Sequence, residues 1–318
     1  MSSTKTNFNK PLFSKEMLKM KKYILFALFS ISPVLLLAQA GSTGLALLKI
    51  GIGGQGAALG ESVVAGNNGA LSAYWNPAGL TQSNDEIVFG HSEWLQDVSY
   101  EFIAMKFHGY NASWGLLLQV QNVDNIMHRT RATPEPLSTF SEHEVVTGLS
   151  YARTLSSNIA VGATAKFISE RHFSYTSAGA AIDLGLRYKL EQLKSVQFGA
   201  SLHNLGKLSD LRNEATKLPA LLRLGFSYSP EFKLAQAKMQ VLGGYTKIFN
   251  NESFAGFGIE ALARESLAFR FGYQVGREAQ SVSAGLGFIL SRYRLDYAYV
   301  PFSFDLGDTH RLSFALVF

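Results

Sequence analysis

Residues 267–274 read Leu-Ala-Phe-Arg-Phe-Gly-Tyr-Gln, and this stretch decides the fold class. Every second residue is large and apolar, whereas the residues between them are small or polar. A period of two is the signature of a β-strand whose two faces meet different surroundings. The same alternation recurs from Glu86 to the end of the chain, for example in residues 112–121 and 178–189.

The composition of the second face separates a membrane barrel from a soluble sheet. A soluble sandwich also alternates, but its exposed positions are rich in Lys, Glu and Thr. Here the second face holds mainly Gly, Ala and Ser with scattered charges, which suits the polar interior of a membrane barrel. We therefore predict an all-β fold, a transmembrane antiparallel β-barrel of about fourteen strands over residues 86–318, with a soluble sandwich as the alternative.

The connections and the C-terminus fit such a barrel. The longer connections fall mainly on one side, which predicts outward loops at residues 122–143 and 204–219 and both barrel ends in the periplasm. The chain ends with Phe314, Leu316 and Phe318 on one face. This pattern resembles the C-terminal signal read by the barrel-assembly machinery, so that machinery and outer-membrane lipid are expected partners. An apolar last strand should also close onto the first strand, because an unpaired one would aggregate.

The net charge of +5 comes entirely from the start of the chain. Residues 1–40 hold six lysines and one glutamate, and the remainder holds 23 basic and 23 acidic residues. A neutral mature chain offers no nucleic-acid footprint. The chain has no cysteine, which excludes disulfides and thiolate metal sites.

The first forty residues predict a cleaved secretory signal peptide. Residues 17–22 are basic, residues 23–37 are an apolar run, and Ala38-Gln39-Ala40 is a small-residue cleavage site. Met17 and Met20 are alternative starts. The apolar run is shorter than the ~20 residues of a transmembrane helix. The expected location is the outer membrane of a Gram-negative cell.

Residues 41–85 are rich in glycine and are expected to form a hatch, or plug, inside the barrel. Residues 51–56 match G-x-G-x-x-G, but no acidic residue follows about twenty positions later and no βαβ alternation is present, so dinucleotide binding is disfavoured. We expect a coil with a short helix near residues 57–65. Pro77 disfavours a helical Asn76, so a second helix should end near Trp75 in a sharp turn.

Three stretches of this segment carry a family resemblance: Leu47-Leu-Lys-Ile-Gly51, Gly56-Ala-Ala-Leu-Gly-Glu61 and Ala73-Tyr-Trp-Asn-Pro-Ala-Gly-Leu80. They resemble the opening of the PorV/PorQ family, which belongs to the barrels similar to the long-chain fatty-acid transporter. The resemblance covers the mature chain in layout, but its specific motifs lie in roughly the first forty mature residues. The shared feature of the internal hatch in this group is matched by Trp75, Asn76, Pro77, Ala78 and Gly79. As a physical element, it suits a turn better than a ligand site.

The resemblance implies a role in type IX protein secretion, in which the barrel binds or shuttles the C-terminal domain of a secreted cargo received from a translocon. The alternative is a transporter of long-chain fatty acids or other hydrophobic solutes, which would use the lumen and a movable hatch. A third hypothesis is a structural barrel that holds partners in the membrane. None of the three requires a cofactor.

Few side chains suggest chemistry. None of the seven histidines has the spacing of a metal site, and His143 between Glu142 and Glu144 is expected in a solvated loop. Ser201 and Asn204 lie close to His203 in the sequence, which suggests a nucleophilic catalytic site. One strand should not place Ser201 and Asn204 on the same face, because three residues separate them. We therefore expect no enzyme activity, no catalytic residue and no metal.

The remaining candidates are charged side chains that the alternation along each strand places inside the barrel. Buried charges are costly unless they are paired or hydrated, so they should hold the hatch in place or pair across strands, with gating as the alternative. They are Asp183, Arg187, Arg223, Glu260, Arg270, Arg294, Asp296 and Arg311.

Overall fold

The computed structural model describes residues 44–318, apart from residues 83, 95–97, 212–215, 232, 235, 250 and 251. The chain divides into two units, Met1–Leu37 and Ala38–Phe318, and the described residues all belong to the second. The predicted signal peptide and its cleavage site lie outside the described residues. None of the helices within the described ranges is long and apolar enough to cross a membrane.

Antiparallel strands form one closed sheet. They are β1 (Glu86–Glu93), β2 (Val98–Gly109), β3 (Ala112–His128), β4 (Ser138–Thr154), β5 (Ile159–His172), β6 (Tyr175–Lys189), β7 (Val196–Leu208), β8 (Leu221–Tyr228), β9 (Lys233–Leu234), β10 (Ala237–Ile248), β11 (Ser253–Ala263), β12 (Leu267–Val275), β13 (Val282–Leu290), β14 (Tyr293–Pro301) and β15 (Asp308–Val317). The two-residue β9 pairs with β10 beyond the end of β8. The ring is therefore a barrel of 14 strands, as predicted.

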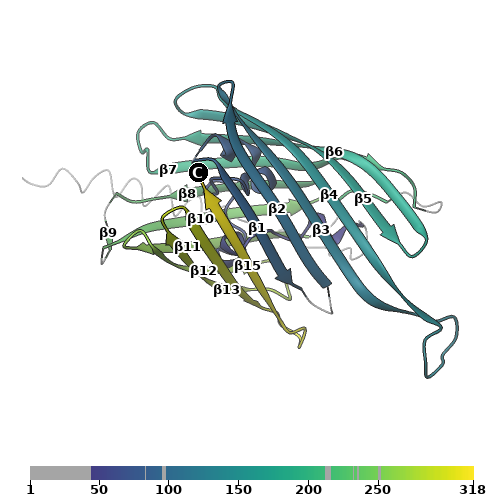
Figure 1. Cartoon of the computed structure of the whole chain (residues 1–318). Coiled ribbons are helices and arrows are strands. Elements are labelled where there is room, and N and C mark those ends of the chain that lie inside the picture. The colour runs from purple at the N-terminus through teal and green to yellow at the C-terminus, as the bar shows by residue number, and fades with distance from the viewer. Residues whose placement is uncertain are drawn as a thin grey trace, which may run out of the picture. The chain divides into compact units, whose positions relative to one another are not determined.

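The barrel is closed by its first and last strands. β15 pairs with β1 from Glu86 opposite Val317 to Glu93 opposite His310, and in Figure 1 the yellow β15 lies beside β1. The last strand thus has no free apolar edge to aggregate. Phe314, Leu316 and Phe318 alternate with the buried Ala315 and with Val317, and Phe314 and Phe318 are exposed on the outside of the sheet.

The two faces of the wall are those predicted from the alternation. On β12, Phe271 is 54% exposed whereas Arg270 is 5% exposed and Gln274 is 2% exposed. The same division holds on β3, where Leu116 and Leu118 are exposed and Gln119 is buried. An outer surface of large apolar side chains is unstable in water and matches the lipid-facing band of a membrane barrel.

The prediction of an outward loop at residues 122–143 is wrong for most of these residues, which belong to strands. β3 continues to His128 and β4 begins at Ser138, so only residues 129–137 connect them. The continuations are largely polar and do not alternate, so the apolar pattern did not predict them, but backbone pairing does not require apolar side chains. Each of these strands has 17 residues, more than the ~9–11 that cross a bilayer, so the hairpin projects beyond the apolar band. β7 likewise continues to Leu208, which leaves residues 209–220 as the loop.

The connections define two ends of the barrel. The connections at residues 129–137 and 209–220 leave what we call the long-loop end. Those at residues 110–111, 155–158 and 291–292 leave the short-turn end. The sidedness of these ends relative to the periplasm stays a prediction.

Residues 44–82, the N-terminal segment, contain η1 (Ala46–Leu48), α2 (Gly54–Ala58), α3 (Ser72–Trp75) and η2 (Pro77–Thr81). The helix expected near residues 57–65 is wrong in position, because α2 ends at Ala58 and turns follow it. Gly60 has a φ of 62°, the left-handed conformation that commonly stops a helix. α3 ends at Trp75 and Asn76 is extended, as the proline at position 77 predicted.

The N-terminal segment contacts the wall around the ring. α2 packs against β12, β13, β14 and β15, and η2 packs against β3, β4, β5 and β6. Because these strands lie on opposite arcs of a closed sheet, the segment is enclosed by the barrel. Whether it acts as a hatch, and whether residues 41–85 form a separate unit, stay predictions.

Candidate functional site

The candidate site is the barrel interior, where the N-terminal segment meets the inner face of the wall. Asn76 is fully buried at its centre. Its Nδ2 donates to the carbonyl oxygens of Val64 at 3.0 Å and Leu186 at 3.1 Å, and its Oδ1 accepts from the backbone N–H of Ala78 at 3.2 Å. One side chain therefore joins two parts of the segment to β6.

Two glycines of the wall make room for this turn. Gly162 of β5 and Gly185 of β6 are paired directly across the sheet. A Cβ on Gly162 would lie 2.5 Å from the carbonyl carbon of Pro77, and one on Gly185 would lie 2.9 Å from the nitrogen of Ala78. Any side chain at either position would push the backbone of the turn away from the wall.

The rest of the expected hatch motif is held in the same place. Trp75 donates its indole N–H to the carbonyl oxygen of Ile52 at 3.2 Å. Gly79 packs against Ser72 and the guanidinium of Arg187, where a Cβ would meet atoms at 2.5 and 2.7 Å. The side chains of Trp75 and Asn76 bind other parts of the chain, and Gly79 packs against them, so these contacts hold the motif in place.

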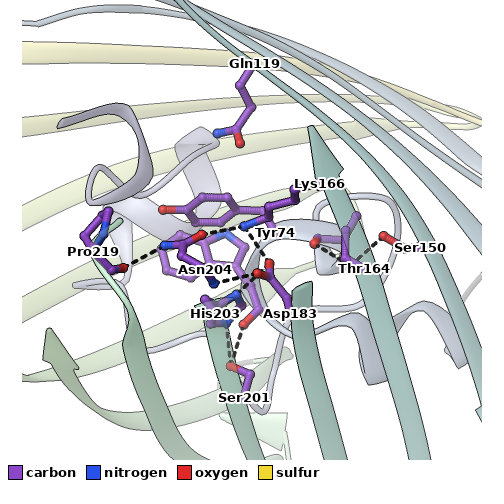
Figure 2. Close-up of polar contacts among 12 residues, drawn as sticks. Tyr74, Gln119, Ser150, Thr164, Lys166, Asp183, Ser201, His203, Asn204 and Pro219 are labelled. Atoms are coloured by element: carbon purple, nitrogen blue, oxygen red, sulfur yellow. Dashed lines mark hydrogen bonds and ion pairs between the residues drawn. The ribbon is translucent and has the colours of Figure 1, made fainter. Parts of the chain in front are cut away.

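A buried polar network surrounds Asp183 on the wall beside this turn (Figure 2). Its Oδ2 lies 2.6 Å from Lys166 Nζ and 2.9 Å from His203 Nδ1, and its Oδ1 accepts from the backbone N–H of Asn204 at 2.8 Å. Asn204 in turn donates to the carbonyl oxygen of Pro219. A carboxylate with so many partners can remain ionised in the interior.

The network contains an arrangement of the Ser-His-Asp type. Ser201 Oγ lies 2.7 Å from His203 Nε2, on the side of the imidazole opposite Asp183. Ser201 also donates to the carbonyl oxygen of Trp75 at 3.1 Å, and Lys166 shares the carboxylate. Ser201 and His203 are each 2% exposed, so a substrate would have to displace the N-terminal segment to reach the hydroxyl. We therefore assign this triad a structural role.

The prediction that Ser201 and Asn204 lie on different faces is wrong. Both side chains are buried inside the barrel. The pairing of β6 with β7 shifts register between Ile182 and Leu184, and Asn204 has a φ of 59°. This bulge interrupts the strict alternation of the strand and turns Asn204 inward.

Four of the eight predicted lumen charges contact the N-terminal segment, and one of them, Glu260, accepts from Gln55 Nε2 at 3.4 Å. Arg187 donates from Nη1 to Asn68 Oδ1 at 2.7 Å and from Nη2 to the carbonyl oxygen of Asn67. The guanidinium of Arg223 lies 4.7 Å from the Trp75 ring centroid and 4.8 Å from that of Tyr74. Arg311 donates to the carbonyl oxygen of Gly51 at 2.8 Å.

Glu260 also joins Arg270, Arg294 and Asp296 in a chain of ion pairs along β11, β12 and β14 to β1. Arg270 lies between Glu260 at 2.5 Å and Asp296 at 2.7 Å. Arg294 then links Asp296 at 2.9 Å to Glu86 at 2.6 Å. Glu86 also accepts from the backbone N–H of Ala70 at 2.8 Å, which ties this chain to the N-terminal segment.

Sequence reasoning missed several inward charges. Lys166 and Lys106 are 4% and 1% exposed, and Lys106 donates to the carbonyl oxygens of Gln82 and Asn84. The alternation of β5 could have predicted the inward position of Lys166, because it lies two residues after Thr164, which is also buried inside the barrel. The inner and outer faces had not been assigned for every strand.

The interior toward the long-loop end holds a cluster of apolar side chains, with the buried Gln119 beside it donating to the Tyr100 hydroxyl at 2.6 Å. Tyr100, Phe102, Leu117, Val146 and Ile168 of β2, β3, β4 and β5 point inward and are at most 3% exposed. They pack in one cluster with Leu45, Leu47 and Leu48 of the N-terminal segment. We call this the apolar compartment.

Beyond the apolar compartment, at the long-loop end, lie Glu144 of β4 and Glu170 and His172 of β5. Glu144 Oε2 accepts from the backbone N–H of Leu47 at 3.2 Å. His172 lies two positions past Glu170 at the end of β5, where the outward residue Arg171 is exposed and polar. Burial alone lowers the pKa of His172, but Glu142 at 2.9 Å and Glu170 outweigh it and raise that pKa above its ordinary value.

His143 does not join these residues. It lies on the outer face, with its Nδ1 2.6 Å from Asn122 Oδ1.

No protein-family model matches the chain, and no curated protein matches it. Solved structures do match in fold. The CymD monoaromatic hydrocarbon channel has a TM-score of 0.61 at 13% identity, over 84% of this chain and 98% of that one. The toluene transporter TodX of Pseudomonas putida has a TM-score of 0.58 at 12% identity, over 83% and 96%. A FadL homologue of Pseudomonas aeruginosa matches at 0.49 and 11% identity, over 82% and 98%. The chain therefore shares its barrel fold with CymD and TodX.

Proposed function

We propose that this protein is an outer-membrane channel that admits small hydrophobic molecules. The observation that carries the proposal is the apolar compartment, because a water-filled porin has a polar interior. Inward-facing Phe102, Val146 and Ile168 form one buried apolar cluster with Leu47 and Leu48. The channels CymD and TodX, whose fold this chain shares, are described as a monoaromatic hydrocarbon channel and a toluene transporter.

The compartment is closed by η1, which we propose as the moving part. Leu47 and Leu48 are 0% and 1% exposed, so they occupy the space that a hydrophobic solute would need. η1 is tied to the wall by the bond from Leu47 N to Glu144, whereas residues 51–82 are tied to it by bonds from Asn76 to Leu186, from Arg187 to Asn68 and from Arg311 to Gly51. Release of η1 would open the compartment while residues 51–82 stay in place. In this proposal only the start of the N-terminal segment acts as a hatch.

Uptake measurements test the proposal. Cells that lack other aromatic-uptake channels should accumulate labelled toluene faster when they express this protein. Ile168→Gln should lower that rate, because a buried amide without partners costs about 1–3 kcal/mol and repels an apolar solute. Ser169→Gln, one position away on the other face of β5, is the matched control. Uptake equal to that of cells without the protein, or equal in both variants, would reject the channel function.

Type IX protein secretion is the second candidate, and the sequence motifs of the N-terminal segment favour it. In that role the outer surface would bind the C-terminal domain of a cargo, and the barrel would dock to a translocon. The β3–β4 hairpin that projects at the long-loop end provides a surface, with Met127 and Leu137 each 63% exposed. Nothing would need to pass through the interior.

A binding assay separates the two candidates. The purified barrel should capture a secreted C-terminal domain if it acts in secretion, and Met127→Ser with Leu137→Ser should abolish that capture. The same double variant should leave toluene uptake unchanged. The outer-membrane location, export through a cleaved signal peptide and recognition of Phe314, Leu316 and Phe318 by the barrel-assembly machinery are part of both proposals.

A further inference from the structure

Three side chains at the long-loop end converge on one point although they come from two strands. Glu144, Glu170 and His172 each place one potential ligand atom within 4.8 Å of the other two. Glu144 and Glu170 are buried, whereas the His172 side chain is 31% exposed. An ion could therefore approach from the histidine side and meet two carboxylates behind it.

A buried acceptor without a partner is the independent sign of a missing ligand. Glu170 is 2% exposed, and no described residue donates a hydrogen bond to its Oε1. Leaving a buried acceptor unpaired costs about 1–3 kcal/mol, and more when the group is charged. A bound cation would satisfy this oxygen.

The imidazole is already oriented for coordination. Glu142 Oε1 lies 2.9 Å from His172 Nδ1, which leaves Nε2 on the side of Glu170, 3.5 Å from its Oε2. A carboxylate on the far nitrogen of a histidine is the usual support of a metal-binding imidazole, because it fixes the ring and its tautomer. Two ligands at about 2.1 Å from a tetrahedral ion are about 3.4 Å apart, close to this separation.

We propose that Glu144, Glu170 and His172 bind a divalent cation that accepts an imidazole together with carboxylates, of which Zn²⁺ is the representative. This ligand set of one nitrogen and two oxygens leaves a coordination position for water. Mg²⁺ and Ca²⁺ are disfavoured because they select oxygen ligands. Lys49 of the N-terminal segment interacts with the charge of Glu144, so the cation has to compete with one ammonium group.

The site would link three parts of the barrel. Glu144 comes from β4, Glu170 and His172 come from β5, and Glu144 also accepts from Leu47 of η1. A bound ion would thus stiffen the wall beside η1. The inference does not depend on the proposed channel function, since it concerns binding alone.

Calorimetric titration of the full-length mature protein in detergent with Zn²⁺ tests the inference. The wild type should bind one Zn²⁺ per chain. His172→Ala and Glu170→Gln should each weaken binding at least tenfold, whereas His143→Ala should bind as the wild type does. His143 is one residue from Glu144 on the opposite face, which makes it a matched control.

A second variant distinguishes a built site from loose attraction to acidic groups. Glu142→Gln keeps all three ligands but loses the support of the imidazole, so it should weaken binding about 10–100-fold. Heat-dependent gel mobility establishes that each variant is a folded barrel. The inference is overturned if the wild type binds no more Zn²⁺ than His172→Ala, or if Mg²⁺ displaces Zn²⁺ at equal concentration.

Discussion

Replacement of Asn76 by alanine should weaken the attachment of the N-terminal segment to the wall while the barrel remains intact. The side chain makes three hydrogen bonds, of which the one to the carbonyl oxygen of Leu186 joins the segment to β6, whereas those with Val64 and Ala78 lie within the segment. The lost bond to the wall is worth about 1 kcal/mol net. Since every 1.4 kcal/mol is a factor of ten, the ratio of docked to undocked segment should fall roughly fivefold.

Amide hydrogen exchange followed by mass spectrometry measures this ratio directly. Peptides from residues 51–82 of Asn76→Ala should exchange roughly fivefold faster than those of the wild type, because exchange follows the population of the open state. Peptides from β12 and β13, which make no contact with Asn76, should keep their rates. Asn158→Ala is the control, since Asn158 lies in the exposed turn between β4 and β5.

Two results would refute this reasoning. If the exchange of residues 51–82 is unchanged, the bonds of Asn76 do not hold the segment. If strand peptides accelerate to the same extent as the segment, the segment and the wall unfold as one unit, and the segment could not move independently of the barrel.

Three further predictions concern two contacts of the interior and the C-terminal residue. Lys166→Met should destabilise the barrel by about 3–5 kcal/mol in urea unfolding, because it breaks a buried ion pair, and Asp183→Asn added to it should recover part of the loss. Gly162→Ala should cost about 1–3 kcal/mol through its clash with the N-terminal segment, whereas Gly109→Ala, whose added methyl meets nothing within 4 Å, should change stability by less than about 0.5 kcal/mol. Deletion of Phe318 should lower the amount of heat-modifiable barrel in the outer membrane without altering synthesis, and unchanged assembly would contradict the role of the C-terminal signal.

Local rules explain why the strands were predictable. A strand in a membrane barrel has lipid on one side and the interior on the other, so the side-chain period of two is present in each strand without reference to its neighbours. Residues 267–274 show it clearly, and Phe271 and Arg270 lie on the faces that the pattern assigned. The end of α3 at Trp75 was also predictable, because the restriction that Pro77 imposes acts on the adjacent residue.

The same local rules failed where the surroundings were not uniform. β3 and β4 continue past the apolar band, where neither face is in lipid, so their sequence no longer alternates. The helix expected near residues 57–65 was placed from composition, but Gly60 and Glu61 both have left-handed backbone angles that stop it. Asn204 points inward because the register of β6 on β7 shifts, which a single strand does not reveal.

The sequence by itself determined the strands, their faces and the turn at Asn76, because each depends on residues that are near one another in the chain. Only the tertiary structure decided which groups meet. Arg294 and Glu86 are 208 residues apart, and Asn76 and Leu186 are 110 apart. Such pairs form only when the barrel closes with one register and encloses the N-terminal segment. The Zn²⁺ site proposed at Glu144, Glu170 and His172 has the same origin, since the pairing of β4 with β5 brings Glu144 opposite Glu170.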